Sequence, residues 1–204
     1  MAGLSDTIHA RVPLLPHFFP NLRPTMKKPW TFDDSNSLYY CTDVIVGWQY
    51  VFTSPEFFET IIDSLKYCQE NKGLRLHAYV IMPNHVHSII SASQGNLSSI
   101  IRDYKRYTSG RISDLLGEAK NKRLLRYFRS VARREERGNE HKIWQSGSHP
   151  VLIESGEFFD QKLEYIHNNP VIKGYVERPA HWKFSSARNY ILNDHSIIKV
   201  DLLE

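Results

Sequence analysis

The chain has 204 residues, of which 41% are hydrophobic and 12% aromatic, a composition that favours one well-cored domain and excludes an intrinsically disordered protein. The formal net charge of +4 is compatible with a polyanionic partner without identifying one. The two cysteines, Cys41 and Cys68, lie far apart in the sequence, which favours free thiols. Because the sequence shows neither a signal-peptide layout nor an apolar run of membrane-spanning length, we expect a cytoplasmic protein with no membrane partner.

The chain is predicted to begin with an extended arm over residues 1–36, because prolines recur through Arg11–Trp30 and disfavour packed secondary structure. A single domain is expected over residues 37–192, with a C-terminal tail over residues 193–204. The first strand of the domain is predicted over Leu38–Val46, where aromatic and β-branched residues predominate.

The segment between Ser54 and Gly73 has the pattern of a helix. Ser54 suits the N-cap, Pro55 suits the first helical position, and Glu56 places negative charge where the helix dipole favours it. Gly73 suits the left-handed residue that ends many helices. Between these ends, apolar residues recur at helical spacing: Phe58, Ile61, Ile62 and Leu65.

A hairpin and a second helix are predicted next. Arg75–Met82 and His85–Ser91 have the composition of strands, and the Pro83–Asn84 pair between them suits a tight turn. Leu97–Leu116 carries apolar residues along one helical stripe and cationic residues on the other side. The sequence therefore continues as strand, turn, strand, helix.

A polar, strongly basic insertion occupies about residues 117–142; a charge run of this kind is either a solvated face or a nucleic-acid contact. A strand-like piece over Lys142–Ile153 and a helix over Gly156–Asn169 follow, and Pro170 is expected to end that helix. The order of elements predicts an α+β protein with a ferredoxin-like, RRM-like arrangement, in which helices cover one face of an antiparallel sheet.

Two histidines lie either side of one valine in the returning strand of the hairpin. Side chains two residues apart point to the same face of a strand, so His85 and His87 are expected to project together while Val86 points away. Such a pair can offer two nitrogen ligands to one metal ion. Because imidazole suits several divalent metals, the pair does not name its ion, and a chance pairing remains the alternative.

A tyrosine and an asparagine share a polar face of the last predicted helix. Tyr165 and Asn169 are four residues apart, and the apolar stripe of the helix, formed by Phe159, Leu163 and Ile166, lies elsewhere. A tyrosine that simply packs its ring and leaves its hydroxyl in water is the ordinary interpretation. A nucleophile placed one helical turn from an amide ligand is the functional one.

At these residues the chain resembles a known family. The segment "YVIMPNHVHSII" is similar to the HUH signature (His, hydrophobic, His) of the single-tyrosine transposases. "KLEYIHNNPVIKGYVERP", followed by "WKFSSARNY", is similar to the C-terminal signature of the REP-associated tyrosine (RayT-like) transposases. The similar regions run from about Leu38 to Ser109 and from Ile143 to Tyr190. The His-x-His pair alone is weakly specific, whereas both signatures in this order are strongly specific.

The resemblance implies the HUH transposase fold and a metal-dependent endonuclease and strand transferase that acts on single-stranded DNA at hairpins such as REP-like elements. Carried over residue by residue, it implies that His85 and His87 bind Mg²⁺ or Mn²⁺ and that Tyr165 is the nucleophile that forms a 5′-phosphotyrosine. Asn169 stands where the wider family has a polar third ligand, often Gln. The long N-terminal arm and the basic insertion depart from compact relatives and leave substrate recognition, and the choice between monomer and homodimer, open.

Contacts with DNA phosphates are expected from the cationic side of the Leu97–Leu116 helix and from the insertion. Tyr127 and Phe128 in the insertion are expected to be exposed and able to stack unpaired bases. The cationic residues concerned are Arg102, Lys105, Arg106, Lys120, Lys122, Arg123, Arg126, Arg129, Arg133 and Arg134.

Three alternatives stay open at this point. Tyr104 and Tyr107 compete for the nucleophile role, although the helical pattern places Tyr104 within the apolar stripe and Tyr107 at its edge. The chain could also be a non-catalytic nucleic-acid-binding or regulatory protein derived from the same fold. A metallohydrolase that uses the histidine pair with carboxylates is a more distant alternative, because "NHVH" has no acidic neighbour.

Overall fold

The computed structural model describes residues 37–135, 140–147 and 150–203, so the arm expected over residues 1–36 lies outside the described residues. The elements are β1 Tyr39–Val44, the 3-10 helix η1 Val46–Trp48, α1 Pro55–Lys72, β2 Leu74–Met82, β3 His85–Ala92, α2 Leu97–Glu118, α3 Lys122–Arg134, β4 Val151–Leu152, α4 Gly156–Ile172, the 3-10 helix η2 Pro179–His181 and α5 Ala187–Leu192.

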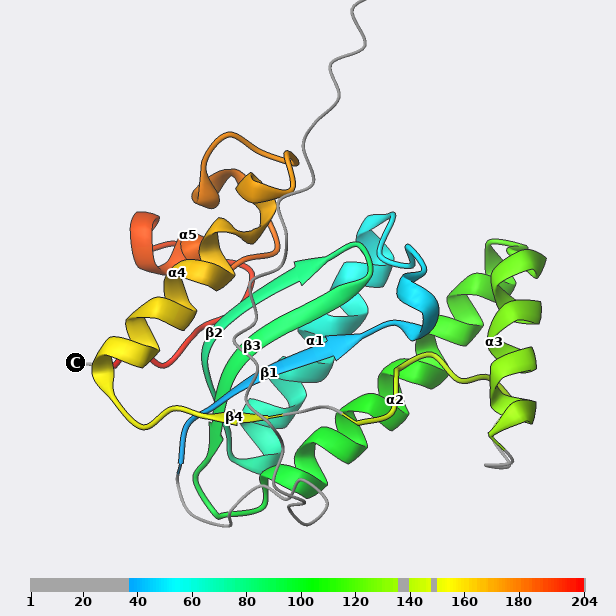
Figure 1. Ribbon diagram of the computed structural model, residues 1–204, viewed down its shortest axis with the longest axis horizontal. Helices are drawn as coiled ribbons and strands as arrows, with labels where there is room; N and C mark the ends of the chain where they lie inside the picture. Colours follow the sequence, from blue (N-terminus) through cyan, green and yellow to red (C-terminus); the bar gives the residue numbers. More distant parts are fainter. Residues whose placement is uncertain (1–36, 136–139, 148–149, 204) are drawn as a thin grey trace, which may run out of the picture.

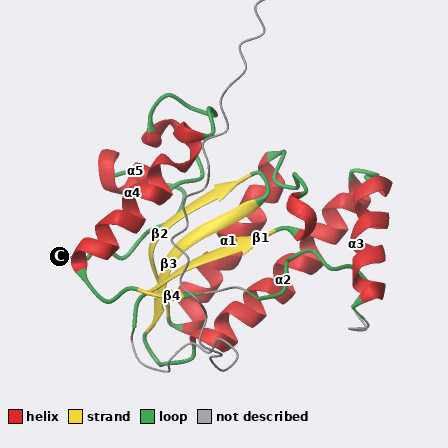
Figure 2. Cartoon of the chain, in the orientation of Figure 1, coloured by secondary structure: helices red, strands yellow, loops and turns green. Residues whose placement is uncertain are grey.

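The strands form one antiparallel sheet in the order β2-β3-β1-β4, which Figures 1 and 2 show as the centre of the molecule. β2 and β3 form the predicted hairpin around the Pro83–Asn84 turn, with Met82 opposite His85. β1 pairs with the other side of β3, so Thr42 lies opposite His87. The α+β, ferredoxin-like fold class expected from the sequence is confirmed.

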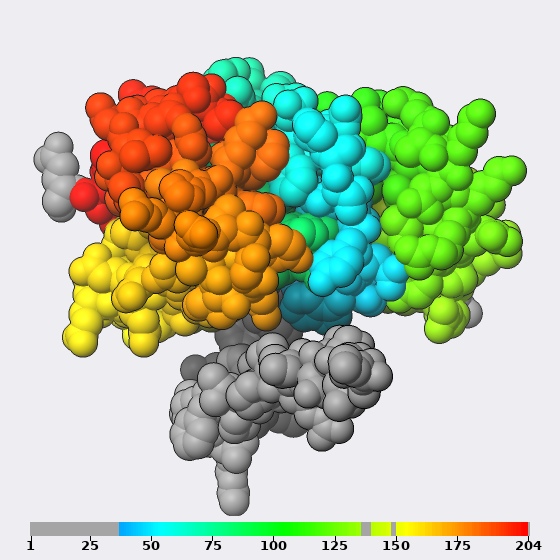
Figure 3. Space-filling view, turned by 90° about the horizontal axis from the view of Figure 1, so that it is seen from above, coloured from blue at the N-terminus to red at the C-terminus, as the bar shows by residue number. Residues whose placement is uncertain are grey.

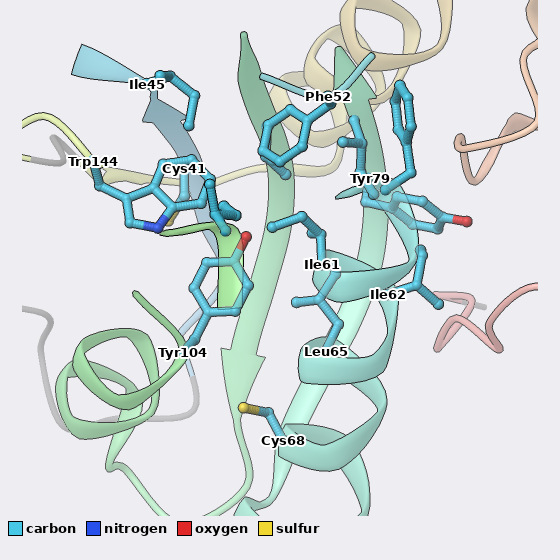
Figure 4. Packing of buried hydrophobic residues seen from close by; sticks show 14 of the residues in the cluster. Cys41, Ile45, Phe52, Ile61, Ile62, Leu65, Cys68, Tyr79, Tyr104 and Trp144 are labelled. Carbon is cyan, nitrogen blue, oxygen red and sulfur yellow. The ribbon is translucent and has the colours of Figure 1, made fainter. Parts of the chain in front are cut away.

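Helices α1 and α2 cover the first face of the sheet and enclose the larger core. α1 begins at Pro55 after Ser54 and ends at Gly73, whose φ of 70° is the left-handed conformation that the sequence predicted. Its apolar stripe packs with residues of β1, β2 and α2, as Figure 4 shows for Ile61 and Tyr104. This face is filled by the apolar core, and none of the predicted metal-binding residues lies on it.

Helix α4 lies on the second face, which refines the expectation of helices on one face. β2 and β3 are buried on both sides along almost their whole length, so their second face also needs a cover. α4 supplies that cover through Phe159 and Ile166. The strand residues beneath it include Tyr40, Ala78, Val80, Met82 and Ile89.

The end predicted for α4 was wrong. Pro170 lies inside the helix, which runs on to Ile172. A proline in the last turn removes one backbone donor and disfavours helical geometry in the residue before it. Here Asn169 and Pro170 are both buried, so packing against the sheet outweighs the local preference.

The basic insertion contains a regular helix, α3. Asn121 caps it by accepting a hydrogen bond from the backbone N–H of Leu124, and Leu124, Phe128 and Ala132 form a buried stripe at helical spacing. The expectation that Phe128 is exposed was therefore wrong, because it lies on this stripe. Tyr127 is partly buried against the same core, so neither ring is a free stacking surface.

The described part of the C-terminal tail packs along β2. The backbone N–H of Asp201 donates to the carbonyl of Leu76, and Ile198 and Val200 are buried in the core. Within the described ranges, no helix combines the length and the apolar character needed to cross a bilayer.

Candidate active site

His85 and His87 project from β3 onto the face that α4 covers, as the strand period predicted. Their ring centroids are 4.6 Å apart, and the side chains are only 7% and 5% exposed. Val86, between them, points into the core under α1 and α2. The structure therefore brings the two imidazoles together at the end of the sheet next to the β2–β3 turn.

Each histidine is held through its Nδ1 atom. His85 Nδ1 donates a hydrogen bond to Asn84 Oδ1 at 2.7 Å. His87 Nδ1 lies 2.8 Å from the Tyr40 hydroxyl and 2.9 Å from Thr42 Oγ1, both on β1. Among the described residues, Nε2 of neither ring forms a hydrogen bond. Ligand histidines usually have this arrangement, with one nitrogen oriented by a neighbour and the other available.

Both imidazoles are neutral near pH 7. Burial lowers the pKa of His85 to about 4, and the positive charge of Lys173 acts in the same direction. Burial also lowers the pKa of His87 to about 3, with smaller effects from His85 and Lys162. Neutral imidazole is the form that binds metal ions.

Tyr165 lies on α4 beside the histidine pair. Its ring centroid is 5.3 Å from that of His87 and 6.3 Å from that of Tyr40, in edge-to-face geometry. The side chain is 45% exposed, so a substrate phosphate can reach it. Because Phe159 and Ile166 fix α4 to the sheet, this closeness follows from the packing of the second core.

Asn169, one turn after Tyr165, has a buried amide oxygen without a partner. The side chain is 4% exposed, and its Oδ1 accepts no hydrogen bond from any described residue. Along α4, Asn169 lies between Tyr165, which contacts His87, and Lys173, whose charge acts on His85. An unpaired buried polar atom is costly, so this oxygen is a candidate ligand atom.

These donors fit a divalent cation. Two neutral imidazoles with available Nε2 atoms and one unpaired amide oxygen can share one ion, and imidazole and oxygen ligands suit several divalent metals. No group of three or more His, Cys, Asp or Glu side chains with metal-binding geometry occurs among the described residues. The unpaired Oδ1 of Asn169 is therefore the candidate for a third protein ligand beside the histidine pair.

Lys162 lies one turn before Tyr165 on the same helix. Its Nζ is 5.0 Å from the centroid of the Tyr40 ring and 4.9 Å from that of Phe158. These cation–π contacts keep an ammonium group beside the two rings. Positive charge therefore flanks the histidine pair on both sides, from Lys162 and from Lys173.

The two competing tyrosines lie elsewhere. Tyr104 is buried in the core of the first face, and Tyr107, although exposed, lies on α2 on that same side of the sheet. His85 and His87 point to the opposite face. The structure does not bring either tyrosine to the histidine pair.

The expected DNA-binding cations fall into two groups. On α2, Arg102 and Arg106 pair with Asp103, and Lys105 binds the buried Asp43 at 2.6 Å. The second group is exposed on α3 or just before it and comprises Lys120, Lys122, Arg123, Arg126, Arg129, Arg133 and Arg134. α3 meets the segment after η1, where Arg123 donates to Gln49 Oε1 at 3.3 Å.

Sequence reasoning missed the residues that orient the histidines. Tyr40 and Thr42 alternate along β1 with the buried residues Tyr39, Cys41 and Asp43, so the sequence gives only a weak signal for a separate polar face. Only the register that sets Thr42 opposite His87 identifies them. Asn84 was interpreted as a turn residue, and its bond to His85 is an additional role.

Comparisons with known proteins show which family and which fold the chain is similar to. Residues 49–129 match the model of the family described as "Transposase IS200 like"; that segment contains both histidines but ends before Tyr165. A search of the curated proteins found no match.

Among solved structures, the chain is similar to a REP-associated tyrosine transposase bound to a REP hairpin. The two are 18% identical, with a TM-score of 0.56 over 88% of this chain and 94% of the other. The resemblance inferred from the sequence is thus confirmed: residues 49–129 match the IS200-like transposases, and the chain has the fold of a REP-associated tyrosine transposase.

Proposed function

We propose that the chain is a metal-dependent single-stranded DNA endonuclease and strand transferase that forms a 5′-phosphotyrosine at Tyr165, acting at DNA hairpins of the REP type. The observation that carries the proposal is the contact of Tyr165 with His87, which joins residues far apart in the sequence. The match to IS200-like transposases and the hairpin bound by the structural relative support the DNA substrate.

His85, His87 and Asn169 would hold Mg²⁺ or Mn²⁺. Bound there, the ion would supply positive charge to a nonbridging oxygen of the scissile phosphate. Because imidazole and amide ligands are neutral, the donor set leaves that charge undiminished. Asn84, Tyr40 and Thr42 keep both imidazoles oriented for this task through their Nδ1 atoms.

Tyr165 would attack the scissile phosphorus through its Oη atom. The P–Oη bond forms, the bond from phosphorus to the 3′ oxygen breaks, and the phenolic proton passes to solvent while the 3′ oxygen takes up a proton. One phosphate ester replaces another, so a second 3′-hydroxyl can reverse the step without ATP. Lys162, held beside Tyr40, would stabilise the phenolate as it forms.

The cations of α3 would bind DNA phosphates next to the site, with those of α2 as a second contact. α3 is the better placed, because Arg123 reaches Gln49 in the segment that leads from η1 to α1. Phosphate contacts of this kind give affinity and a strong salt dependence without reading sequence.

Incubation with a panel of hairpin oligonucleotides and Mn²⁺ tests the proposal. We expect a covalent protein–DNA adduct on a denaturing gel for the wild type. We expect none for Tyr165→Phe, although this variant should still bind the oligonucleotide. Hairpin binding by the wild type with no adduct under any divalent metal would instead support the non-catalytic DNA-binding alternative.

A further inference from the structure

Trp48 is an exposed aromatic residue in a strained backbone conformation. Its side chain is 56% exposed, and its φ of 55° follows a φ of 63° at Gly47. Bulky residues rarely adopt the left-handed region, and such outliers cluster at functional sites. A side chain at position 47 would collide with the Tyr127 hydroxyl, so α3 packs closely over this turn.

A single amide joins Trp48 to the histidine pair. Asn84 accepts a hydrogen bond from His85 Nδ1 at 2.7 Å through Oδ1, and its Nδ2 donates to the Trp48 carbonyl at 3.3 Å. The indole consequently stands edge-on to the His85 ring, with centroids 5.8 Å apart. The Trp48 ring therefore lies next to a histidine that would hold the metal.

Two more exposed rings lie at the same end of the sheet. The Tyr50 side chain interacts with that of Tyr175, and the Tyr175 ring packs on Trp182 with centroids 5.4 Å apart. The segment after Tyr50 is tied to the β2–β3 turn, because the backbone N–H of Val51 donates to the Pro83 carbonyl at 2.9 Å. In Figure 3, the cyan surface of this segment and the orange surface of α4 and its following loop flank the green hairpin.

This surface suits an unpaired nucleobase. A solvent-facing indole offers a π face to any base, and stacking of this kind tolerates different sequences. The neighbouring charges suit a nucleic-acid backbone, since Lys173 acts on His85 from one side and Arg123 lies by Gln49 on the other. An acidic protein segment would use the cations but not the flat ring, and an apolar segment would use the ring but not the cations. A single-stranded nucleic acid uses both.

We propose that Trp48 stacks on the unpaired base next to the scissile phosphate and so positions that phosphate over His85 and His87, with Tyr50 and Tyr175 extending the stacking surface. The inference rests on the proposed function and adds to it a positioning residue for single-stranded DNA. It also gives a reason for the strained turn, which directs an indole toward solvent beside a metal-ligand candidate.

Binding to oligonucleotides with an abasic site at each position flanking the scissile phosphate tests the inference, in a Tyr165→Phe background that prevents cleavage. For Trp48→Ala we expect an affinity loss of roughly 5- to 100-fold, the range for one base–aromatic stack. Trp48→Phe should retain most of the parent's affinity. The matched control is Tyr67→Ala, equally exposed at 56% but on α1, and should leave affinity unchanged.

The decisive result is whether the effects of the abasic site and of Trp48→Ala are additive. At one position, the abasic site should weaken binding by the parent protein but should cause little additional loss in Trp48→Ala, which already lacks the stacking ring. Equal losses from that abasic site in both proteins, or unchanged affinity for Trp48→Ala, would overturn the inference.

Fluorescence gives a second measurement in a protein with the turn intact. The intact oligonucleotide should quench the Trp48 emission, taken as the difference from Trp48→Phe, and the abasic oligonucleotide should not. Equal quenching by both would overturn the inference even if Trp48→Ala fails to fold. These assays measure binding, so a wild type that binds and stacks DNA without forming an adduct would contradict the proposed function and leave the stacking inference standing.

Discussion

Asn169 and Asn189 are both buried asparagines of the C-terminal half, yet their amides differ in what they bind. Asn189 Nδ2 donates to the Ile198 carbonyl at 2.8 Å, whereas Asn169 Oδ1 has no partner among the described residues. Replacement by an apolar side chain of similar size should therefore have opposite effects at the two positions: it removes a hydrogen bond at Asn189 and an unpaired buried oxygen at Asn169.

Asn169→Leu should therefore keep or raise the thermal unfolding midpoint of the metal-free protein, because it removes an unpaired buried oxygen that costs about 1–3 kcal/mol. It should also abolish the stabilisation that Mn²⁺ gives the wild type. Asn189→Leu is the control and should lower stability by about 1–3 kcal/mol while the Mn²⁺ effect persists. Thermal scans with and without Mn²⁺ measure both; undiminished stabilisation of Asn169→Leu by Mn²⁺ would remove Asn169 from the site.

The positions of the candidate site residues were more predictable than the contacts around them. A period of two placed His85 and His87 on one face, and a spacing of four placed Tyr165 and Asn169 on one side of a helix; both are local rules that the structure obeys. The partners of the histidines depend on which strands pair and in which register, so Asn84 and Tyr40 could not be assigned their contacts from the sequence.

At the level of elements, α4 determines whether the site exists, because it carries Tyr165 and Asn169 to the sheet. It is fixed partly by a buried polar contact: His167 Nε2 is 2.9 Å from Ser186 Oγ, which also bonds the backbone of Tyr79 on β2. The sequence predicted the helix but not its passage through Pro170, since the buried contacts that hold the last turn are tertiary.

Stability should fall as the pH drops from about 6.5 to 4. Burial lowers the pKa of His167 to about 4, so in this window the unfolded chain binds a proton that the folded chain does not, and the stability present above pH 6.5 is lost. The loss from this one group is at most ~3 kcal/mol. His167→Gln should show a shallower decline in denaturant titrations over this pH range. If the stability of His167→Gln fell with pH as steeply as that of the parent, His167 would not contribute to the decline. The parent is the necessary reference because His77, His85 and His87 are also buried with lowered pKa values.

Helix α3 exposes its cationic residues on the side opposite its buried stripe. Leu124 and Phe128 have helical spacing, but the many charged residues around them made this pattern hard to recognise in the sequence. Phe128 was therefore wrongly expected to be exposed. The same amphipathic pattern leaves Lys122 and Arg126 exposed, and these two are available for phosphate contacts.

The double variant Lys122→Gln/Arg126→Gln should weaken binding to single-stranded DNA and flatten its salt dependence. Each lost phosphate contact should reduce the slope of log affinity against log salt by about 0.7. Lys199→Gln, which removes the charge of an exposed lysine in the C-terminal segment, is the control for loss of positive charge away from α3. Binding titrations at several salt concentrations measure the slopes; equal slopes for the wild type and the double variant would contradict an α3 contact.

Over the whole molecule, the sheet separates two tasks. The face under α1 and α2 is a closed apolar core, and the face under α4 carries the histidines, Tyr165 and Asn169. Helices α1 and α2 therefore close one face of the sheet, and α4 closes the other and brings Tyr165 next to His87. The fold class followed from the order of elements, but which helix covers which face depended on the burial of β2 and β3 on both sides.

Because Tyr165 contacts His87 of its own chain, the nucleophile and the metal ligands should act in cis. A mixture of Tyr165→Phe and His87→Ala should then form no more adduct than either variant alone, as seen on a denaturing gel with Mn²⁺ and hairpin DNA. Recovery of adduct in the mixture would show that α4 serves a partner chain and that the arrangement within one chain is not the reactive one.

The most direct test of the central claim is mass spectrometry of the peptide that carries DNA after reaction with Mn²⁺ and a cleavable hairpin oligonucleotide. The account predicts a 5′-phosphate linked to Tyr165, and loss of that linkage in Tyr165→Phe. A phosphotyrosyl linkage at Tyr107, or an adduct that persists in Tyr165→Phe, would contradict it.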